Sequence, residues 1–248
     1  MPPVQPEKVK MKRIVWLVLC IVGLSGCQNG QMNEILQAAL STRQEPLTQG
    51  TIVAGLREAL EVGTQRAVAD ASKAGGFSAS DLLRIQTPDE LDNLEKTLRR
   101  IGMGSYVDQF EDKLNLAAEQ AAAEAAPVFV QAIQEMTIQD AVGILQGADN
   151  AATEYFRSRT EPQIRQKMMP IINRHLGEVG AAHLYNDLVM KYNALPFAKE
   201  PVLNLEDYVA ARTLDGLFSL VEKEEAAIRQ DPVARTTDLL RRVFGAKQ

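Results

Sequence analysis

Helical periodicity with recurrent capping signals is the feature that most constrains the fold of this chain. Beyond the first 46 residues, long segments rich in Ala, Leu, Glu, Gln and Arg repeat their apolar residues at helical spacing, and Thr, Asn, Asp, Gly and Pro punctuate them. No stretch alternates β-branched and polar residues as a half-buried strand would. The sequence therefore predicts an all-α fold, a single multi-helix, bundle-like domain.

Capping residues and prolines set the expected helix boundaries. We expect Thr48, Thr137, Asp149 and Asn204 to cap helices, and Thr87 to open a capping box that Glu90 completes. The expected helices are a tether at Asn29–Thr42, a helix after Thr48, Pro88–Ile101, Ser105–Ala126, a segment to Met136 that Pro127 either kinks or starts, Ile138–Gln146, Asn150 to about Arg159, another from Thr160-Glu161-Pro162, Ala181–Tyr192, Leu205–Arg229, and a last helix from Asp231-Pro232 to Gly245. Residues 72–86 and 193–203 are the expected loops.

The helix after Thr48 carries a ridge of small residues at a spacing of four: Gly55, Ala59, Gly63 and Ala67. A ridge of larger residues runs beside it: Ile52, Leu56, Leu60 and Val68. Ridges at this spacing favour close crossing of another helix at an inclined angle. We therefore expect this helix to be a packing centre.

The N-terminal region has the pattern of a secretory signal. Lys12 and Arg13 precede an eleven-residue apolar run, Ile14–Leu24, and the small residues Ser25 and Gly26 follow it. A transmembrane helix needs roughly 20 apolar residues, so a retained signal anchor is the weaker interpretation. Residues 1–26 are therefore expected to be a signal peptide.

The tetrapeptide Leu24-Ser25-Gly26-Cys27 resembles the lipobox of bacterial lipoproteins. The resemblance implies cleavage before Cys27 and acylation of that cysteine with a diacylglycerol and an N-acyl chain. Several acyl chains hold a protein stably on a membrane. An ordinary cleaved signal peptide is the alternative.

The residue after the cysteine bears on the membrane that carries the anchor. In enterobacterial lipoproteins an aspartate there favours the inner membrane, and Gln28 is not one, so we expect a periplasm-facing lipoprotein of the outer membrane. Met11 is a more natural start than Met1. The expected organisation is a signal peptide (1–26), a lipidated N-terminus with its tether helix (27–46), and an all-α periplasmic domain (47–248).

Charge and cysteine content exclude some classes of protein. Residues 1–26 carry four of the Lys and Arg residues and one Glu, so their removal changes the formal net charge from −5 to −8. An acidic domain argues against a nucleic-acid partner. Cys20 would leave with the signal peptide and Cys27 would be acylated, so we expect no disulfide in the mature chain.

Three groups of residues resemble a bacterial envelope family known as domain of unknown function 4197: Ile52–Leu60, Gly143–Gly147 with Ala151–Phe156, and Asp231–Leu240 with Val243–Gly245. The resemblance extends over about 47–245. It implies one helical domain and brings no activity, cofactor or catalytic residue to any position.

Candidate catalytic and metal-binding residues are sparse. His175 and His183 are the two histidines, and a zinc site needs three or four converging ligands. The sequence lacks the HExxH motif, the paired Glu-x-x-His of di-iron bundles and the G-x-S-x-G elbow of serine hydrolases. We therefore expect structural or surface histidines and no metal or other cofactor.

Two polar faces are candidate sites. Glu111, Asn115 and Glu119 share one face at a spacing of four, which forms either a buried polar site or, as we favour, a solvated face. Asp149, Thr153 and Arg157 form the preferred candidate surface, on which Arg157 and Thr153 would grip an anionic partner such as a peptidoglycan stem or a lipid headgroup. In the alternative, Asp149 only caps the helix, while Thr153 and Arg157 face water or brace a neighbour.

The last helix is basic. Its cationic residues are Arg235, Arg241, Arg242 and Lys247. They are placed either to meet anionic headgroups or, as we favour, to decorate an ordinary amphipathic helix.

The sequence thus favours a membrane-anchored lipoprotein that binds or scaffolds in the cell envelope without catalysis. The expected partners are the membrane, through the acyl chains on Cys27, and an envelope protein or peptidoglycan. The alternatives are a carrier of an apolar ligand in a helical cavity and an envelope hydrolase.

Overall fold

The computed structural model describes residues 46–196, 198–199 and 201–245, and within these ranges it contains helices and turns but no strand. The prediction of an all-α fold is confirmed. The α-helices are α3 (Gln49–Ala71), α4 (Asp92–Arg100), α5 (Gly104–Ala123), α6 (Ala125–Glu135), α7 (Ala141–Leu145), α8 (Ala151–Glu178), α9 (Ala181–Asn193), α10 (Leu205–Gln230) and α11 (Asp238–Gly245). The 3₁₀ helices η2 (Asp89–Leu91) and η3 (Pro232–Ala234) precede α4 and α11. Residues Leu47–Gln248 form one compact unit.

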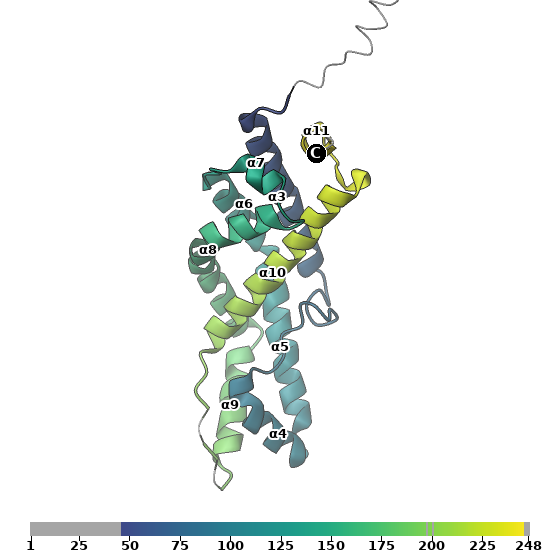
Figure 1. Ribbon diagram of the computed structural model, residues 1–248. Coiled ribbons are helices and arrows are strands. Elements are labelled where there is room, and N and C mark those ends of the chain that lie inside the picture. The colour runs from purple at the N-terminus through teal and green to yellow at the C-terminus, as the bar shows by residue number, and fades with distance from the viewer. Residues whose placement is uncertain (1–45, 197, 200, 246–248) are drawn as a thin grey trace, which may run out of the picture. The chain divides into compact units, whose positions relative to one another are not determined.

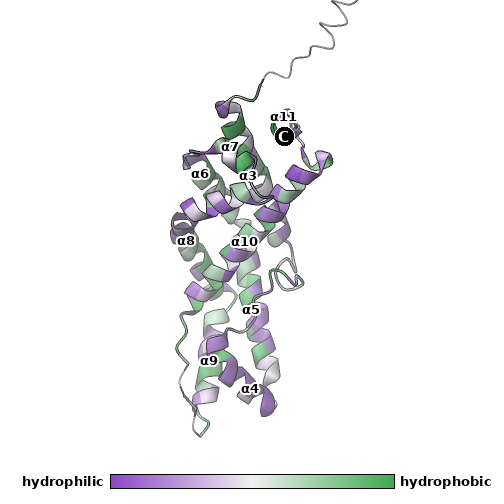
Figure 2. Cartoon of the chain, in the orientation of Figure 1, coloured by the Kyte–Doolittle hydropathy of each residue, from purple (hydrophilic) through white to green (hydrophobic). Residues whose placement is uncertain are grey.

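The helix α10 runs obliquely across the unit, in contact with α3, α5 and α8 (Figure 1). Near its C-terminal end α10 packs on α3, which also contacts α6, α7 and α11. At the opposite end of the unit, α5 packs on α4 and α9 (Figure 1). The helix α8 contacts both α5 and α10. Figure 2 shows hydrophobic and hydrophilic residues interspersed along α8 and α10, as expected of amphipathic helices that bury one face.

Three phenylalanine rings fill the space where α6, α8 and α10 meet. Phe129, Phe156 and Phe218 are fully buried, and their ring centroids lie 5.2–5.9 Å apart in tilted and edge-on arrangements. Such pairs are each worth about 0.5–1.5 kcal/mol beyond the area that they bury. The centre of the unit is therefore a packed aromatic core.

The small-residue ridge of α3 is a packing surface, as expected. A Cβ atom built on Gly55 would lie 2.5 Å from Cγ2 of Val243 in α11, and one on Gly63 would lie 3.4 Å from Cβ of Glu224 in α10. These approaches bring both helices against the ridge. Gly55 in particular leaves room for the buried side chain of Val243.

Long-range packing overrides one expected boundary. The new helix expected at Thr160-Glu161-Pro162 is wrong, because α8 continues through Pro162 and Pro170 to Glu178. An internal proline costs about 3 kcal/mol or more. Burying large apolar side chains stabilises by about 1.5–3 kcal/mol each, and α8 buries Ile164, Met168 and Ile172 beyond its first proline.

The capping residues agree with expectation in part. Thr48 and Asn204 accept backbone N–H bonds from Thr51 and Asp207 and so cap α3 and α10 as expected. The expected cap at Thr137 is wrong, because Asp140 caps the shorter helix α7 by accepting from the N–H of Gly143. Pro127 lies in the first turn of α6, so it starts a new helix.

Substitution of Gly55 by Ala should destabilise the protein by about 1–3 kcal/mol, because the added Cβ overpacks the contact with Val243. Gly177→Ala is the matched control, since nothing lies within 4 Å of its Cβ position in α8, and it should be neutral or stabilising by about 0.5–1 kcal/mol. Urea denaturation followed by circular dichroism measures both. Equal effects of the two substitutions would contradict the close contact, and Val243→Ala should partly rescue Gly55→Ala.

Candidate functional site

A row of buried polar side chains on α5 binds the segment that connects α3 to α4. We call these residues, Glu111, Asn115 and Glu119, the polar ladder. They are 8 %, 1 % and 6 % exposed, so the expectation of a solvated face is wrong. The connecting segment covers them, and its backbone N–H groups require these side chains as acceptors.

Each member of the polar ladder accepts main-chain hydrogen bonds. Oε1 of Glu119 accepts from the N–H groups of Phe77 and Ser78 at 3.1 and 3.2 Å. The amide of Asn115 makes two bonds of 2.8 Å with Ile85, one to its N–H and one to its carbonyl. These bonds fix the backbone of the segment from residue 77 to residue 85.

Glu111 completes the polar ladder at the end of this segment. Its Oε1 accepts from both the N–H and the hydroxyl of Thr87 at 2.9 Å, and its Oε2 pairs with Arg84 at 3.2 Å. The expected capping box of Thr87 and Glu90 is therefore wrong, since the Thr87 hydroxyl is bound to Glu111 and η2 begins without a side-chain cap.

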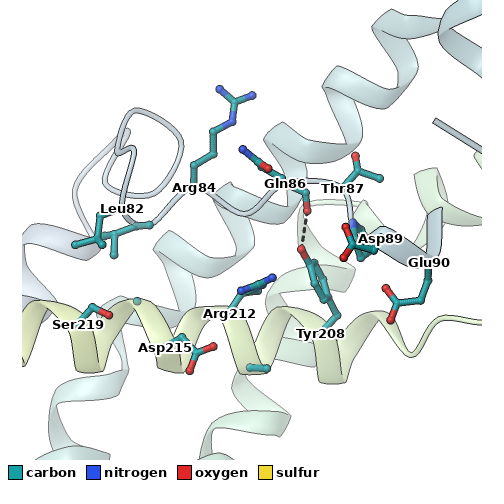
Figure 3. Close-up of a pocket in the computed structure, with 14 residues that line it drawn as sticks. Leu82, Arg84, Gln86, Thr87, Asp89, Glu90, Tyr208, Arg212, Asp215 and Ser219 are labelled. Atoms are coloured by element: carbon teal, nitrogen blue, oxygen red, sulfur yellow. Dashed lines mark hydrogen bonds between the residues drawn. The ribbon is translucent and has the colours of Figure 1, made fainter. Parts of the chain in front are cut away.

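Residues 84–88 of the fixed segment belong to no helix or turn, and their backbone groups point in two alternating directions. Ile85 and Thr87 direct their N–H groups to α5, whereas Gln86, between them, directs its carbonyl to the hydroxyl of Tyr208 on α10 at 2.9 Å (Figure 3). The phenol donates this bond because a carbonyl can only accept, and burial raises the pKa of Tyr208. In the described part of the chain, the N–H of Gln86 has no hydrogen-bond acceptor.

An open groove of about 610 Å³ lies between residues 82–90 and α10; we call it the α10 groove. On α10 it is lined by Tyr208, Ala211, Arg212, Asp215, Gly216 and Ser219. A Cβ atom on Gly216 would lie 3.1 Å from Cδ2 of Leu83, so this glycine permits the close approach of the two walls.

One cation of the α10 groove lacks a carboxylate partner. Arg84 pairs with Glu111, and Asp215 pairs with Arg157 outside the groove. The guanidinium of Arg212 lies 5.5 Å from the ring centroid of Tyr208, and it forms no ion pair with any residue that the structure describes. Arg212 is exposed to the groove and is therefore available to a ligand.

The structure does not assemble Asp149, Thr153 and Arg157 into a surface. Thr153 is fully buried, and its N–H and hydroxyl donate to Glu225 of α10 at 2.7 and 2.6 Å. Asp149 accepts from the side chain of Gln230 instead of capping α8, so that expected cap is also wrong. Arg157 pairs with Glu161 and Asp215 and braces α8 against α10.

Glu225 takes the role that was expected of Asp149. This buried carboxylate accepts from the N–H groups of Ala152 and Thr153 at the start of α8, and it pairs with Arg229 at 2.7 Å. Arg229 in turn donates to the carbonyls of Ile144 and Leu145 at the C-terminal end of α7. The sequence signal for this cluster was a Glu and an Arg spaced four apart on α10.

The remaining candidates have structural or surface positions. His175 is buried, with Nε2 2.8 Å from Oε1 of Glu124, while His183 is exposed. Hydrogen bonds from Arg174 and His175 lower the pKa of Glu124. Among the described residues, no group of three or more His, Cys, Asp or Glu side chains is placed to hold a metal ion.

The basic residues of the C-terminal region are dispersed. Arg235 donates to the carbonyls of Ile228 and Arg229, Arg241 pairs with Asp238 at 2.8 Å, and Arg242 is exposed. Lys247 lies outside the described residues, as do the predicted lipidation site Cys27 and its flanking residues Leu24, Ser25 and Gly26. None of the described helices has the length and hydropathy of a membrane-spanning helix.

The fold and the groove define an all-α domain in which buried polar side chains of one helix hold a long connecting segment against another. A family model described as protein of unknown function (DUF4197) matches residues 46–245, so the chain belongs to this family. Searches of curated proteins and of solved structures found no match to the chain.

Substitution of Asn115 by Ala should destabilise the protein by about 2–4 kcal/mol, because it leaves the N–H and the carbonyl of Ile85 buried without partners. Asp112→Ala, at an exposed position of the same helix, should change stability by less than about 0.5 kcal/mol. Urea denaturation measures both, and hydrogen exchange should show early loss of protection at the Ile85 amide. Unchanged protection there in Asn115→Ala would contradict the role of the polar ladder.

Proposed function

We propose that the protein is a lipid-anchored lipoprotein of the bacterial outer membrane that acts by binding an envelope component. The anchor is supported by the sequence Leu24-Ser25-Gly26-Cys27 after an apolar run too short to span a bilayer. Gln28, in place of an aspartate, favours the outer membrane. The acyl chains on Cys27 would hold the domain at the membrane surface.

The α10 groove is the observation that carries the binding role. Its volume of about 610 Å³ falls within the roughly 300–1,000 Å³ of small-ligand sites. The polar ladder fixes one wall, and a wall that is already ordered lowers the entropic cost of binding. Arg212 on the opposite wall offers a cation that no carboxylate of the described residues neutralises.

The two other hypotheses receive less support from the same features. Phe129, Phe156 and Phe218 fill the centre of the helical unit, and the α10 groove is polar and open, which suits an apolar ligand poorly. For a hydrolase, the groove would need a nucleophile in contact with a base. The hydroxyl of Tyr208 instead donates to a backbone carbonyl. The hydroxyl of Thr87 donates to Glu111, but this carboxylate also accepts from the N–H of Thr87 and pairs with Arg84, so it holds the segment in place.

Substitution of Cys27 by Ala should abolish lipidation, because acyl transfer requires the cysteine sulfur. Labelled palmitate followed by membrane fractionation measures this, with the wild type labelled and in the membrane fraction. Cys20→Ala is the matched control and should be labelled like the wild type, since that residue precedes the cleavage site. Label on Cys27→Ala, or a wild type that stays out of the membrane fraction, would contradict the anchor.

Charge reversal of Arg212 to Glu should weaken binding of the purified protein to isolated cell-envelope fragments several-fold, because it places a fourth carboxylate in the groove. Arg100→Glu is the matched control: Arg100 is exposed on α4, lies outside the groove lining and has no ion pair with a described residue. Co-sedimentation gives the bound fraction. Equal binding by the two variants would contradict a binding role for the groove.

A further inference from the structure

We propose that the α10 groove binds a short peptide that has both a free carboxylate and a free amine. The inference rests on the proposed binding function and specifies the ligand class. It follows from three features of the groove: an available guanidinium, a peptide edge with an unused donor, and two unpaired carboxylates.

The guanidinium of Arg212 is suited to the carboxylate. Its Cζ atom lies over the ring of Tyr208, 5.5 Å from the ring centroid, and the hydroxyl of Tyr208 is bound to the carbonyl of Gln86. A guanidinium placed in this way presents its N–H groups as a fork that matches a carboxylate in two parallel hydrogen bonds. Tyr208 is thus a positioning residue for Arg212.

The backbone at residues 84–88, which belongs to no helix or turn, is suited to the peptide backbone of a ligand. Because the polar ladder binds Ile85 and Thr87 on one edge, the peptide group of Gln86 faces the other edge and α10. Its N–H is the unused donor, and its carbonyl has a second lone pair beside the bond from Tyr208. A ligand in extended conformation can pair with such an exposed edge as an added strand does.

Asp89 and Glu90 are suited to the amine. Both are exposed and neither forms an ion pair with a described residue. In Figure 3 they lie on the side of Tyr208 opposite to Arg212, so the groove presents a cation and an acidic pair separated by an aromatic ring. A ligand with charges of both signs at its two ends complements this arrangement.

The balance of charge in the lining excludes polyanionic ligands. Asp89, Glu90 and Asp215 line the groove together with Arg84 and Arg212, so carboxylates outnumber guanidinium groups. A phosphate or a nucleotide would be repelled by the acidic side of the groove, since like charges brought together destabilise a complex. A zwitterionic peptide avoids this repulsion and uses both signs of charge.

The proposal is tested with trialanine and its two capped forms, N-acetyl-trialanine and trialanine amide, by titration calorimetry on the full-length protein in detergent micelles. Trialanine should bind, and the affinity of each capped form should be lower by a factor of about ten or more, because each loses one charge-assisted contact. Equal binding of the three peptides, or binding of none of them at millimolar concentration, would overturn the proposal.

Variants assign the two ends of the ligand. Arg212→Gln should remove the preference for trialanine over its amide and keep the preference over the acetylated form, while Glu90→Gln combined with Asp89→Asn should do the reverse. Arg100→Gln should bind all three peptides like the wild type. Melting curves should show each variant folded, since the substituted residues are exposed.

Two comparisons complete the test. The first distinguishes a wrong ligand class from a wrong binding function, and the second identifies the source of the peptide. If no peptide binds but Arg212→Glu still releases the protein from envelope fragments, the ligand class is wrong and the binding function stands. If both effects are absent, the binding function is wrong as well. Within a positive result, tighter binding of a peptide ending in D-alanine assigns the ligand to peptidoglycan stems, and tighter binding of the L-form assigns it to polypeptide termini.

Discussion

The bonds between the polar ladder and the segment before α4 are the constraint on which the candidate site depends. A connecting segment that lies against a helix buries backbone groups, and each one left without a partner costs about 1–3 kcal/mol. Glu111, Asn115 and Glu119 supply acceptors at a spacing that matches one helix face, so the segment is held at three points along α5. The same bonds leave the opposite edge of the segment facing α10 and thereby form one wall of the groove.

The start of α8 follows the same principle. Its first N–H groups are satisfied by Glu225, which lies 72 residues away from Thr153 in the sequence, and Arg229 balances the buried charge. A buried ion pair that is also fully hydrogen-bonded can offset its desolvation cost. In both places a side chain from a long helix provides what a local capping residue was expected to provide.

The proposed anchor and the groove belong to different parts of the chain, and each supports a different half of the functional proposal. Acylation at Cys27 would determine where the protein resides, whereas Arg212, Gln86 and the acidic pair Asp89–Glu90 would determine what it binds. Membership of the DUF4197 family agrees with the helical domain and leaves the ligand to be determined by the chemistry of the groove.

The sequence by itself determined the helical class, the packing ridge of α3 and the caps at Thr48 and Asn204, because periodicity and capping depend on residues within one or two turns of each other. It also showed the spacing of Glu111, Asn115 and Glu119, although not their burial. Only the tertiary structure decided their burial and the passage of α8 through Pro162. It also decided that Glu225, and not Asp149, binds the first N–H groups of α8, and that residues 82–90 and α10 form the two walls of the groove. Each of these depends on hydrogen bonds or apolar contacts between segments far apart in the chain, whose free energies outweigh the local preferences of the residues concerned.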